Sequence, residues 1–404
     1  MLKSLFNKWV FLVLMICVLV SLRRTPEKSI ESETELTQPI FCVFLQRDLA
    51  QEDEASSGSI LYLEYAYYRE TCPEAEKIVN SRMAGIYEED QDVSAGLLRL
   101  FFHDCFIRCV DFFCSSLTEV RGISFLEFKG FSLLGNGNKS YLIERQAIPH
   151  TTLKGFDKIG LIKEELEMAC PGVVSCADTL ALATRDGILL AGGPYYPVFT
   201  GRRDSIRSYY QEAMAGVPGP DDNLNRILQL FSVRGFNERE TVRAHNIGKI
   251  SCQFIRSRLY KFKGTGQPDS TMTDDFLNEM RLNCQESNNI SVDVAPAPMR
   301  SRKVTELTAG MSYYQGLTSS ISAGAGFDTH YFHSLLKGRG LLYSDQQLMT
   351  DVKTADIVRA YASDDGRTFR VDFARAMVKL SILGVLYGSQ GQVRTNCTLP
   401  VNNS

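Results

Sequence analysis

The chain has 404 residues, of which 44% are hydrophobic, so it can form one large domain or two lobes with a buried core. Its formal net charge is -3, so the chain has no excess of basic residues, which argues against nucleic acid as a partner. Its 11 cysteines are many for a cytosolic enzyme and favour an oxidising compartment, where disulfides persist.

The N-terminus carries a candidate targeting segment. A basic start precedes an apolar run from Trp9 to Leu22, which has the length of a signal-peptide core and is short for a membrane span. Two arginines follow the run directly and no small-residue cleavage site is visible, so we expect residues 1–24 to be a signal peptide or an uncleaved signal anchor. Residues 25–60 are polar and acidic without a helical period, which predicts a disordered arm.

An organised domain is expected over residues 61–398. It begins with a Cys-Pro turn at Cys72 that leads into an amphipathic helix. The next stretch is LLRLFFHDCF, from Leu97 to Phe106, and on a helix it places Arg99 and His103 on one face. A fixed cation and a base can therefore reach one small volume, which is an arrangement suited to acid–base chemistry.

Other interpretations of this stretch lead away from that chemistry. An arginine and a histidine on an apolar helix face often form only a satisfied core pair. A hydrolytic triad of His103, Asp104 and Cys105 is excluded, because consecutive helix residues do not face one another. A zinc site with His103, Cys105 and Cys109 lacks a second ligand pair at the usual spacing.

The remainder alternates between helical patterns and two atypical stretches. One helix is expected to end at Cys170-Pro171, and the next begins near Ser175, whose hydroxyl suits an N-cap. Residues 223–236 predict a further amphipathic helix. Residues 112–143 have no period and are expected to be an insertion, and the Ser-, Asn-, Ala- and Pro-rich residues 285–322 a surface excursion.

Several of these stretches together resemble the secreted plant haem peroxidases, the class III family. The resemblance is carried by LLRLFFHDCF, ETVRAHNIGK, GAGFDTHYFHSLL and SDQQLM, and it covers roughly residues 61–106, 144–284 and 322–397. It implies a mainly α-helical, two-lobed fold with haem b between a distal and a proximal lobe.

On the distal side, the resemblance implies that His103 takes a proton from hydrogen peroxide and returns it to the departing oxygen. Arg99 would stabilise the negative charge that develops, and Phe102 would line the same volume. Family members usually carry an asparagine that orients the distal histidine at the position of His150. A protonated imidazole cannot replace that acceptor, so we expect slower peroxide activation than in relatives.

On the proximal side, the resemblance assigns His245 as the axial ligand of the haem iron and Asp345 as the carboxylate that hydrogen-bonds it. Gly248 is expected to end the helix that carries His245. The stretch before His245 is about three residues shorter than in the family, so the helix must rotate or unwind there. Pro218 matches the position near the site for phenolic donors.

The resemblance further implies two calcium sites. The distal site would use Asp104, the Ile107 carbonyl and Asp111, and the proximal site Asp328 and Asn246. We expect weak occupancy, because Asn246 offers one oxygen where the usual threonine offers two. The two remaining histidines, His330 and His333, are expected on a helix surface.

The cysteines can be paired by the family's disulfide frame. The pairs implied are Cys72–Cys170, Cys105–Cys109, Cys176–Cys397 and Cys252–Cys284. Sequons at Asn138, Asn289 and Asn396 make the chain a candidate glycoprotein.

Together these features predict a secreted, monomeric haem peroxidase that reduces hydrogen peroxide and oxidises small phenolic donors by single-electron steps. A membrane is expected as a partner only if the N-terminal segment stays uncleaved. Two alternatives remain open. In these, the chain is either a secreted haem-binding relative whose site is impaired, or a helical binding module that disulfides stabilise and that binds no haem.

Overall fold

A computed structural model describes residues 63–107, 144–206, 208–242, 245–248, 250, 252–284, 286 and 327–399. The expected signal segment, the acidic arm, the insertion at 112–143 and most of the surface excursion at 285–322 lie outside these residues. Among the described residues, no helix is both long and apolar enough to span a membrane.

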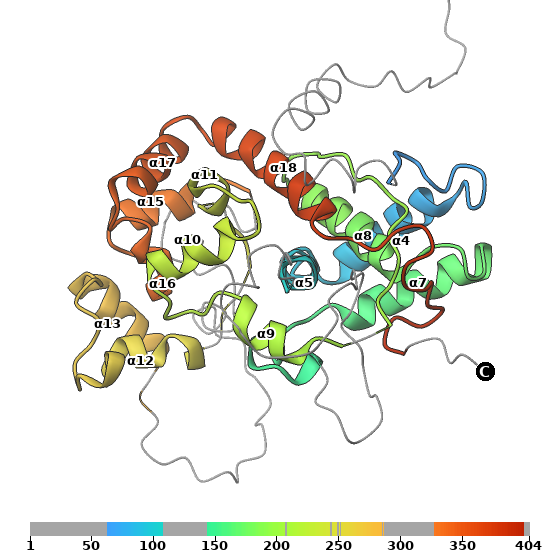
Figure 1. Ribbon diagram of the computed structural model, residues 1–404. Helices are drawn as coiled ribbons and strands as arrows, with labels where there is room; N and C mark the ends of the chain where they lie inside the picture. Colours follow the sequence, from blue (N-terminus) through green and yellow to red (C-terminus); the bar gives the residue numbers. More distant parts are fainter. Residues whose placement is uncertain are drawn as a thin grey trace, which may run out of the picture. The chain divides into compact units, whose positions relative to one another are not determined.

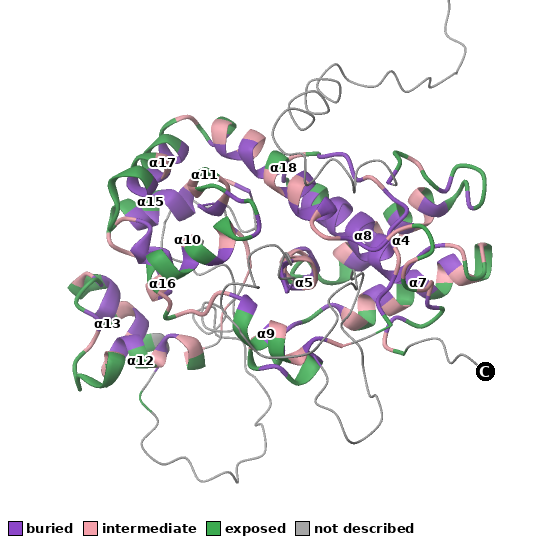
Figure 2. Ribbon diagram, in the orientation of Figure 1, coloured by how far each residue is buried: buried purple, intermediate pink, exposed green. Residues whose placement is uncertain are grey.

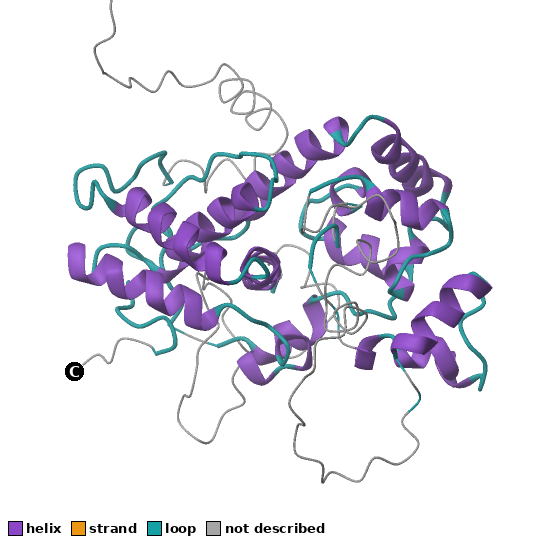
Figure 3. Cartoon of the chain, turned by 180° about the vertical axis from the view of Figure 1, so that it is seen from behind, coloured by secondary structure: helices purple, strands orange, loops and turns teal. Residues whose placement is uncertain are grey.

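The described part of the chain is mainly helical, as predicted (Figure 3). β-structure in these residues is limited to isolated bridges, such as Glu64 with Thr200. The α-helices are α4 Ala75–Glu89, α5 Val93–Phe106, α7 Phe156–Ala169, α8 Cys176–Leu190, α9 Tyr210–Gly216, α10 Leu224–Ser232, α11 Glu238–Thr241, α12 Arg256–Tyr260, α13 Asp274–Asn283, α15 His330–Leu336, α16 Tyr343–Gln347, α17 Val352–Ser363 and α18 Arg367–Ile382. Short 3-10 turns are η1 Glu144–Gln146, η2 Ile148–His150, η3 Cys252–Phe254 and η4 Phe262–Gly264.

Helix α5 occupies the centre of the helical arrangement (Figure 1). It packs closely against α8, which in turn packs against α4 and α7. Leu97 and Leu100 of α5 are fully buried in the main hydrophobic core. Because three helices surround α8, nearly its whole length is buried, as Figure 2 shows. The distal stretch recognised in the sequence is therefore fixed on a rigid, buried scaffold.

The N-cap of α8 lies where the sequence predicted it. The Ser175 hydroxyl accepts a hydrogen bond from the backbone N–H of Asp178 at 3.1 Å, which satisfies a helix-end donor. The preceding helix, α7, ends at Ala169, immediately before Cys170, also as predicted. Both boundaries follow from local chemistry that the sequence displays.

Substitution of Ser175 by alanine is expected to lower the free energy of unfolding by about 1 kcal/mol, because the buried Asp178 N–H loses its acceptor. Urea denaturation of the purified chain measures this loss. The Ser175→Thr variant keeps a capping hydroxyl and serves as the control. Equal losses in both variants would show that the effect comes from packing rather than from the cap.

Three disulfides join distant parts of the chain, and each is a pair that the family frame implies. They are Cys72–Cys170, Cys176–Cys397 and Cys252–Cys284. Cys109, the expected partner of Cys105, lies outside the described residues.

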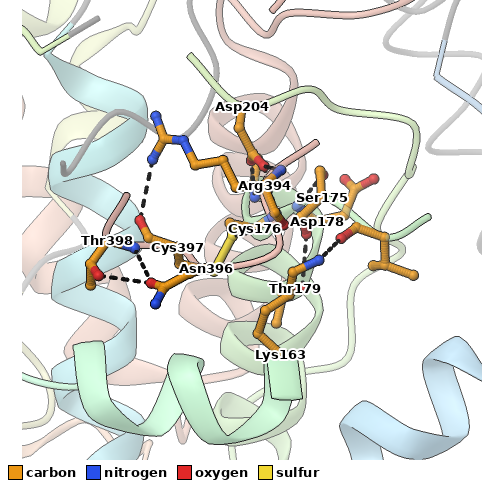
Figure 4. Close-up of a disulfide and its surroundings, with 12 residues drawn as sticks. Lys163, Ser175, Cys176, Asp178, Thr179, Asp204, Arg394, Asn396, Cys397 and Thr398 are labelled. Atoms are coloured by element: carbon orange, nitrogen blue, oxygen red, sulfur yellow. Dashed lines mark hydrogen bonds between the residues drawn. A yellow bond between two sulfur atoms is a disulfide. The ribbon is translucent and has the colours of Figure 1, made fainter. Parts of the chain in front are cut away.

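The Cys176–Cys397 disulfide holds the C-terminal segment against the start of α8 (Figure 4). Asp204 beside it is fully buried and accepts backbone hydrogen bonds from Cys176 at 3.1 Å, Ala177 at 2.9 Å and Arg394 at 2.9 Å. The side chain of Arg394 donates to the Cys397 carbonyl at 3.2 Å. One carboxylate thus connects the N-terminus of α8 with the end of the chain.

The helix predicted over residues 223–236 is shorter in the structure. Asn223 caps α10 by accepting from the Arg226 N–H at 2.9 Å, but the helix ends at Ser232. Gly235 then takes a left-handed conformation, with φ of 80°, that reverses the chain. Phe236 is buried after this turn rather than on the helix.

Candidate active site

Helix α5 presents Arg99 and His103 as the sequence predicted, one helical turn apart. His103 is 4% exposed. The Arg99 guanidinium donates to the Pro149 carbonyl at 3.2 Å and to the Thr152 hydroxyl at 3.1 Å. Arg99 therefore joins the distal helix to the segment that follows the predicted insertion.

Phe102 lies between the two polar residues in sequence and borders the distal histidine. Its ring meets that of His103 edge-on, with centroids 5.7 Å apart. It also stacks on Phe106 at 4.6 Å and on Phe231 of α10 at 6.0 Å. This aromatic cluster fixes Phe102 and gives one side of the distal region an apolar wall.

The protein keeps His103 neutral. Its pKa lies well below the ordinary value because burial disfavours the charged ring, and the charges of Arg99 and His150 add to that effect. A neutral imidazole carries a free lone pair, which a general base requires.

His150 lies directly beside His103, with ring centroids 5.1 Å apart. Its Nδ1 lies 3.0 Å from the Glu144 carbonyl. Burial lowers the pKa of His150 to about 4, although the hydrogen bond to the Glu144 carbonyl acts in the opposite direction. The expectation of slow peroxide activation assumed a protonated ring, so on this geometry it applies only in acidic solution.

The proximal candidate His245 is held by Asp345. Its Nδ1 lies 2.7 Å from Oδ1 of Asp345, so Nδ1–H donates and Nε2 keeps its lone pair. Asp345 also accepts from the Tyr331 hydroxyl at 3.2 Å and from the Leu342 N–H at 2.9 Å. Partial burial lowers the pKa of His245, but the charge and hydrogen bond of Asp345 outweigh this and raise it.

The backbone conformation at His245 explains how its side chain reaches Asp345 although the stretch before it is shorter than in the family. Helix α11 ends at Thr241, and His245 lies outside any helix with φ of 62°, a left-handed conformation that is unusual for a histidine. The chain has unwound, one of the two outcomes expected. The expectation that Gly248 ends this helix is wrong, because the helix stops earlier.

Several contacts place the proximal segment near the distal helix. The positive charge of Arg99 adds to the lowering of the pKa of His103 and opposes the rise in the pKa of His245. A side-chain carbon added at Gly248 would lie 3.1 Å from the Cβ of Ala95, one turn before Arg99 on α5. The two histidines thus share one electrostatic environment around Arg99.

The candidate calcium residues are only partly described. Asn246 is buried, donates to the Asp328 carbonyl at 2.6 Å, and has an Oδ1 without a hydrogen-bond partner in the described chain. The carboxylate of Asp328 accepts from the backbone and ring of His330. Asp104 and Ile107 are described and Asp111 is not; the described residues hold no cluster of three or more His, Cys, Asp or Glu side chains suited to a metal.

His330 is buried rather than on a helix surface, so that expectation is wrong, whereas His333 is exposed as expected. Pro218 lies in the loop after α9. No sequence pattern indicates the contacts that Thr152 and Tyr331 make. Thr152 contacts Arg99, 53 residues away, and Tyr331 contacts Asp345, 14 residues away, and only the folded structure reveals these contacts.

The sequence of the chain is similar to those of known proteins. A protein-family model described as peroxidase matches residues 79–364. The chain is 42% identical over 376 residues to Putative Peroxidase 48 of Arabidopsis thaliana, covering 89% of this chain and 87% of that protein. It is 33% identical to Peroxidase 1 of Arabidopsis thaliana, covering 84% and 92%, and 36% identical to Peroxidase N1 of Nicotiana tabacum, covering 82% and 88%.

Proposed function

Because the chain belongs to the peroxidase family, we propose that it reduces hydrogen peroxide, with His103 and Arg99 acting on the peroxide and His245 as the residue that would bind a haem. The observation that carries the assignment of residues is the His245–Asp345 hydrogen bond at 2.7 Å. It joins segments 100 residues apart and leaves one imidazole nitrogen available as an iron ligand.

The chemistry of the donor set fits haem. With Nδ1 of His245 committed to Asp345, Nε2 is the remaining ligand nitrogen, and the side chain is 49% exposed, so it can be approached. His103 is held on a separate element with its pKa lowered, which suits a histidine that stays off the iron and acts as a base. When bound, the haem supplies the iron at which the peroxide O–O bond is broken and electrons are exchanged.

Each side chain has a defined task in this reaction. Nε2 of His103 removes the proton from one oxygen of hydrogen peroxide and returns it to the other, which leaves as water. The Arg99 guanidinium stabilises the negative charge that develops on the departing oxygen. Two donor molecules then supply one electron and one proton each, so that the second oxygen also becomes water.

The donors we propose are small phenols, and Pro218 marks their binding region by the family resemblance. Secretion is proposed on the apolar N-terminal run and the disulfides. Calcium is proposed at the proximal side, where the buried Oδ1 of Asn246 lacks a partner in the described chain and suits a hard cation. His330 engages the neighbouring Asp328 carboxylate, so we expect weak binding there.

An absorption spectrum of the full chain mixed with haem, recorded before and after hydrogen peroxide, tests the proposal. We expect a ferric Soret band that shifts when peroxide is added. A band that does not shift would indicate the impaired haem-binding relative. A spectrum that shows only unbound haem would indicate a helical binding module that does not bind haem.

Substitution of Asp345 by asparagine is expected to slow the reaction with hydrogen peroxide by roughly 10- to 100-fold, because the carboxylate that makes His245 more electron-donating is lost. Stopped-flow absorption measures the rate. Asp356→Asn removes an exposed carboxylate of α17, which pairs with Arg359, and is the matched control. Equal rates for the wild type and Asp345→Asn would show that this hydrogen bond has no part in the reaction.

A further inference from the structure

Two buried imidazoles meet beside the distal helix, and the mechanism above uses only one of them. His103 is 4% exposed and His150 1% exposed, and their rings are inclined at 61°. Nδ1 of His103 and Nε2 of His150 are both buried, and neither has a hydrogen-bond partner in the described part of the chain. A buried nitrogen left without a partner is unfavourable, so each nitrogen is a candidate partner for the other.

The contact with Glu144 fixes which nitrogen of His150 carries the proton. A backbone carbonyl only accepts, so Nδ1 of His150, 3.0 Å away, must be the N–H donor. In a neutral ring Nε2 then holds a lone pair, and burial keeps the ring neutral by lowering its pKa to about 4. His150 therefore offers an acceptor at Nε2, in a ring that lies beside that of His103.

The position of Glu144 is itself well defined. Glu144 is fully buried, its N–H donates to the Ser208 hydroxyl at 2.6 Å, and its carboxylate accepts from the Tyr209 N–H at 3.1 Å. The carbonyl that orients His150 is thus anchored on both sides. Pro149, the residue before His150, also contacts the distal helix, because its carbonyl accepts a hydrogen bond from the Arg99 side chain at 3.2 Å.

From this geometry we infer that His150 is a positioning residue: its Nε2 accepts a hydrogen bond from Nδ1–H of His103 and so leaves the Nε2 lone pair of His103 free. If Nε2 of His103 carried the proton instead, Nδ1 of His103 and Nε2 of His150 would both present lone pairs in a buried site, which is unfavourable. The centroid separation of 5.1 Å is close enough for a small ring rotation to complete the bond. The inference rests on the proposed function for its catalytic meaning, but the hydrogen bond does not depend on haem.

Nitrogen-15 NMR of the full chain with labelled histidines tests the hydrogen bond, with and without bound haem in its diamagnetic ferrous carbonyl form. We expect a proton on Nδ1 of His103 and a scalar coupling between that nitrogen and Nε2 of His150. A proton on Nε2 of His150, or no coupling, would overturn the inference. A chain that binds no haem contradicts the proposed function, while the spectrum of the haem-free chain still decides this inference.

Two substitutions test the positioning role in the haem-loaded protein. We expect His150→Leu to slow the reaction with hydrogen peroxide by roughly 10- to 100-fold, as for other losses of a partner that orients a functional imidazole. His150→Asn restores an acceptor and is expected to stay within about threefold of the wild type. Ile148→Ala, at a 66% exposed position of the same turn, controls for local disturbance. An unchanged rate in His150→Leu, or an equal loss in His150→Asn, contradicts the positioning role.

Discussion

The His103→Leu variant is expected to react with hydrogen peroxide roughly 10²- to 10⁴-fold more slowly than the wild type, because the side chain that moves the proton is gone. Leucine fills a similar volume in the core beside Phe102, so the fold should persist. Stopped-flow absorption of the haem-loaded protein measures the rate constant. His245, on a separate segment, keeps its contact with Asp345, so haem binding should be retained.

The matched control is His333→Leu, which removes an exposed histidine from α15. Its rate should equal that of the wild type. A loss of less than tenfold in His103→Leu would mean that another group moves the proton.

The pH dependence of the wild type provides a separate measurement of the same role. Burial and the charges of Arg99 and His150 lower the pKa of His103, so its base form persists as the solution becomes acidic. We therefore expect the rate to stay constant as pH falls from neutral through the ordinary histidine range near about 6.5, and to decline only below it. A rate that already halves at about 6.5 would contradict the lowered pKa.

The Asp178→Ala variant is expected to lose about 3–5 kcal/mol of unfolding free energy, because it leaves a buried arginine without its counter-charge. Asp178 is fully buried and accepts from the Arg202 side chain at 2.7 Å, the Tyr68 hydroxyl at 2.7 Å and the Gly201 N–H at 2.7 Å. Urea denaturation monitored by circular dichroism measures the loss.

For comparison, Asp157→Ala removes an exposed carboxylate from the first turn of α7 and should cost about 0.5 kcal/mol or less. If Asp178→Ala and Asp157→Ala were equally stable, the buried Asp178 carboxylate would contribute no more to stability than the exposed Asp157 carboxylate.

A second substitution, Arg202→Met, tests the charge pair directly. Added to Asp178→Ala, it removes the arginine charge as well, so no unpaired charge remains buried and part of the lost unfolding free energy should be recovered.

Local chemistry in the sequence was sufficient for much of the helical framework. Ser175 and Asn223 cap α8 and α10 because their side chains satisfy neighbouring backbone donors without help from distant residues. The spacing of Arg99 and His103 placed both on one face of α5, since helical geometry alone decides this. The prediction ended α10 too late, because the apolar repeat stops at Phe231 and the left-handed Gly235 marks the turn that follows the helix.

The candidate site was predicted less completely. Resemblance pointed to His245 and Asp345, yet the left-handed backbone at His245 was not visible, because it arises where a shortened segment must still meet Asp345. The sequence shows a histidine at position 150 where the family usually carries an asparagine, but the ordinary pKa of a histidine does not describe His150 in the folded chain. The buried surroundings change that pKa, and burial is a property of the fold.

By itself, then, the sequence determined the elements whose form depends on neighbours within a few residues: the distal helix, the helix caps and the helix face that the side chains of Arg99 and His103 share. Only the tertiary structure decided the environment of those groups. Partner choice and pKa depend on atoms brought together from distant segments, such as the Glu144 carbonyl beside His150 and Asp345 beside His245. Solvent exclusion, which keeps His103 and His150 neutral, requires the whole core to be packed around them.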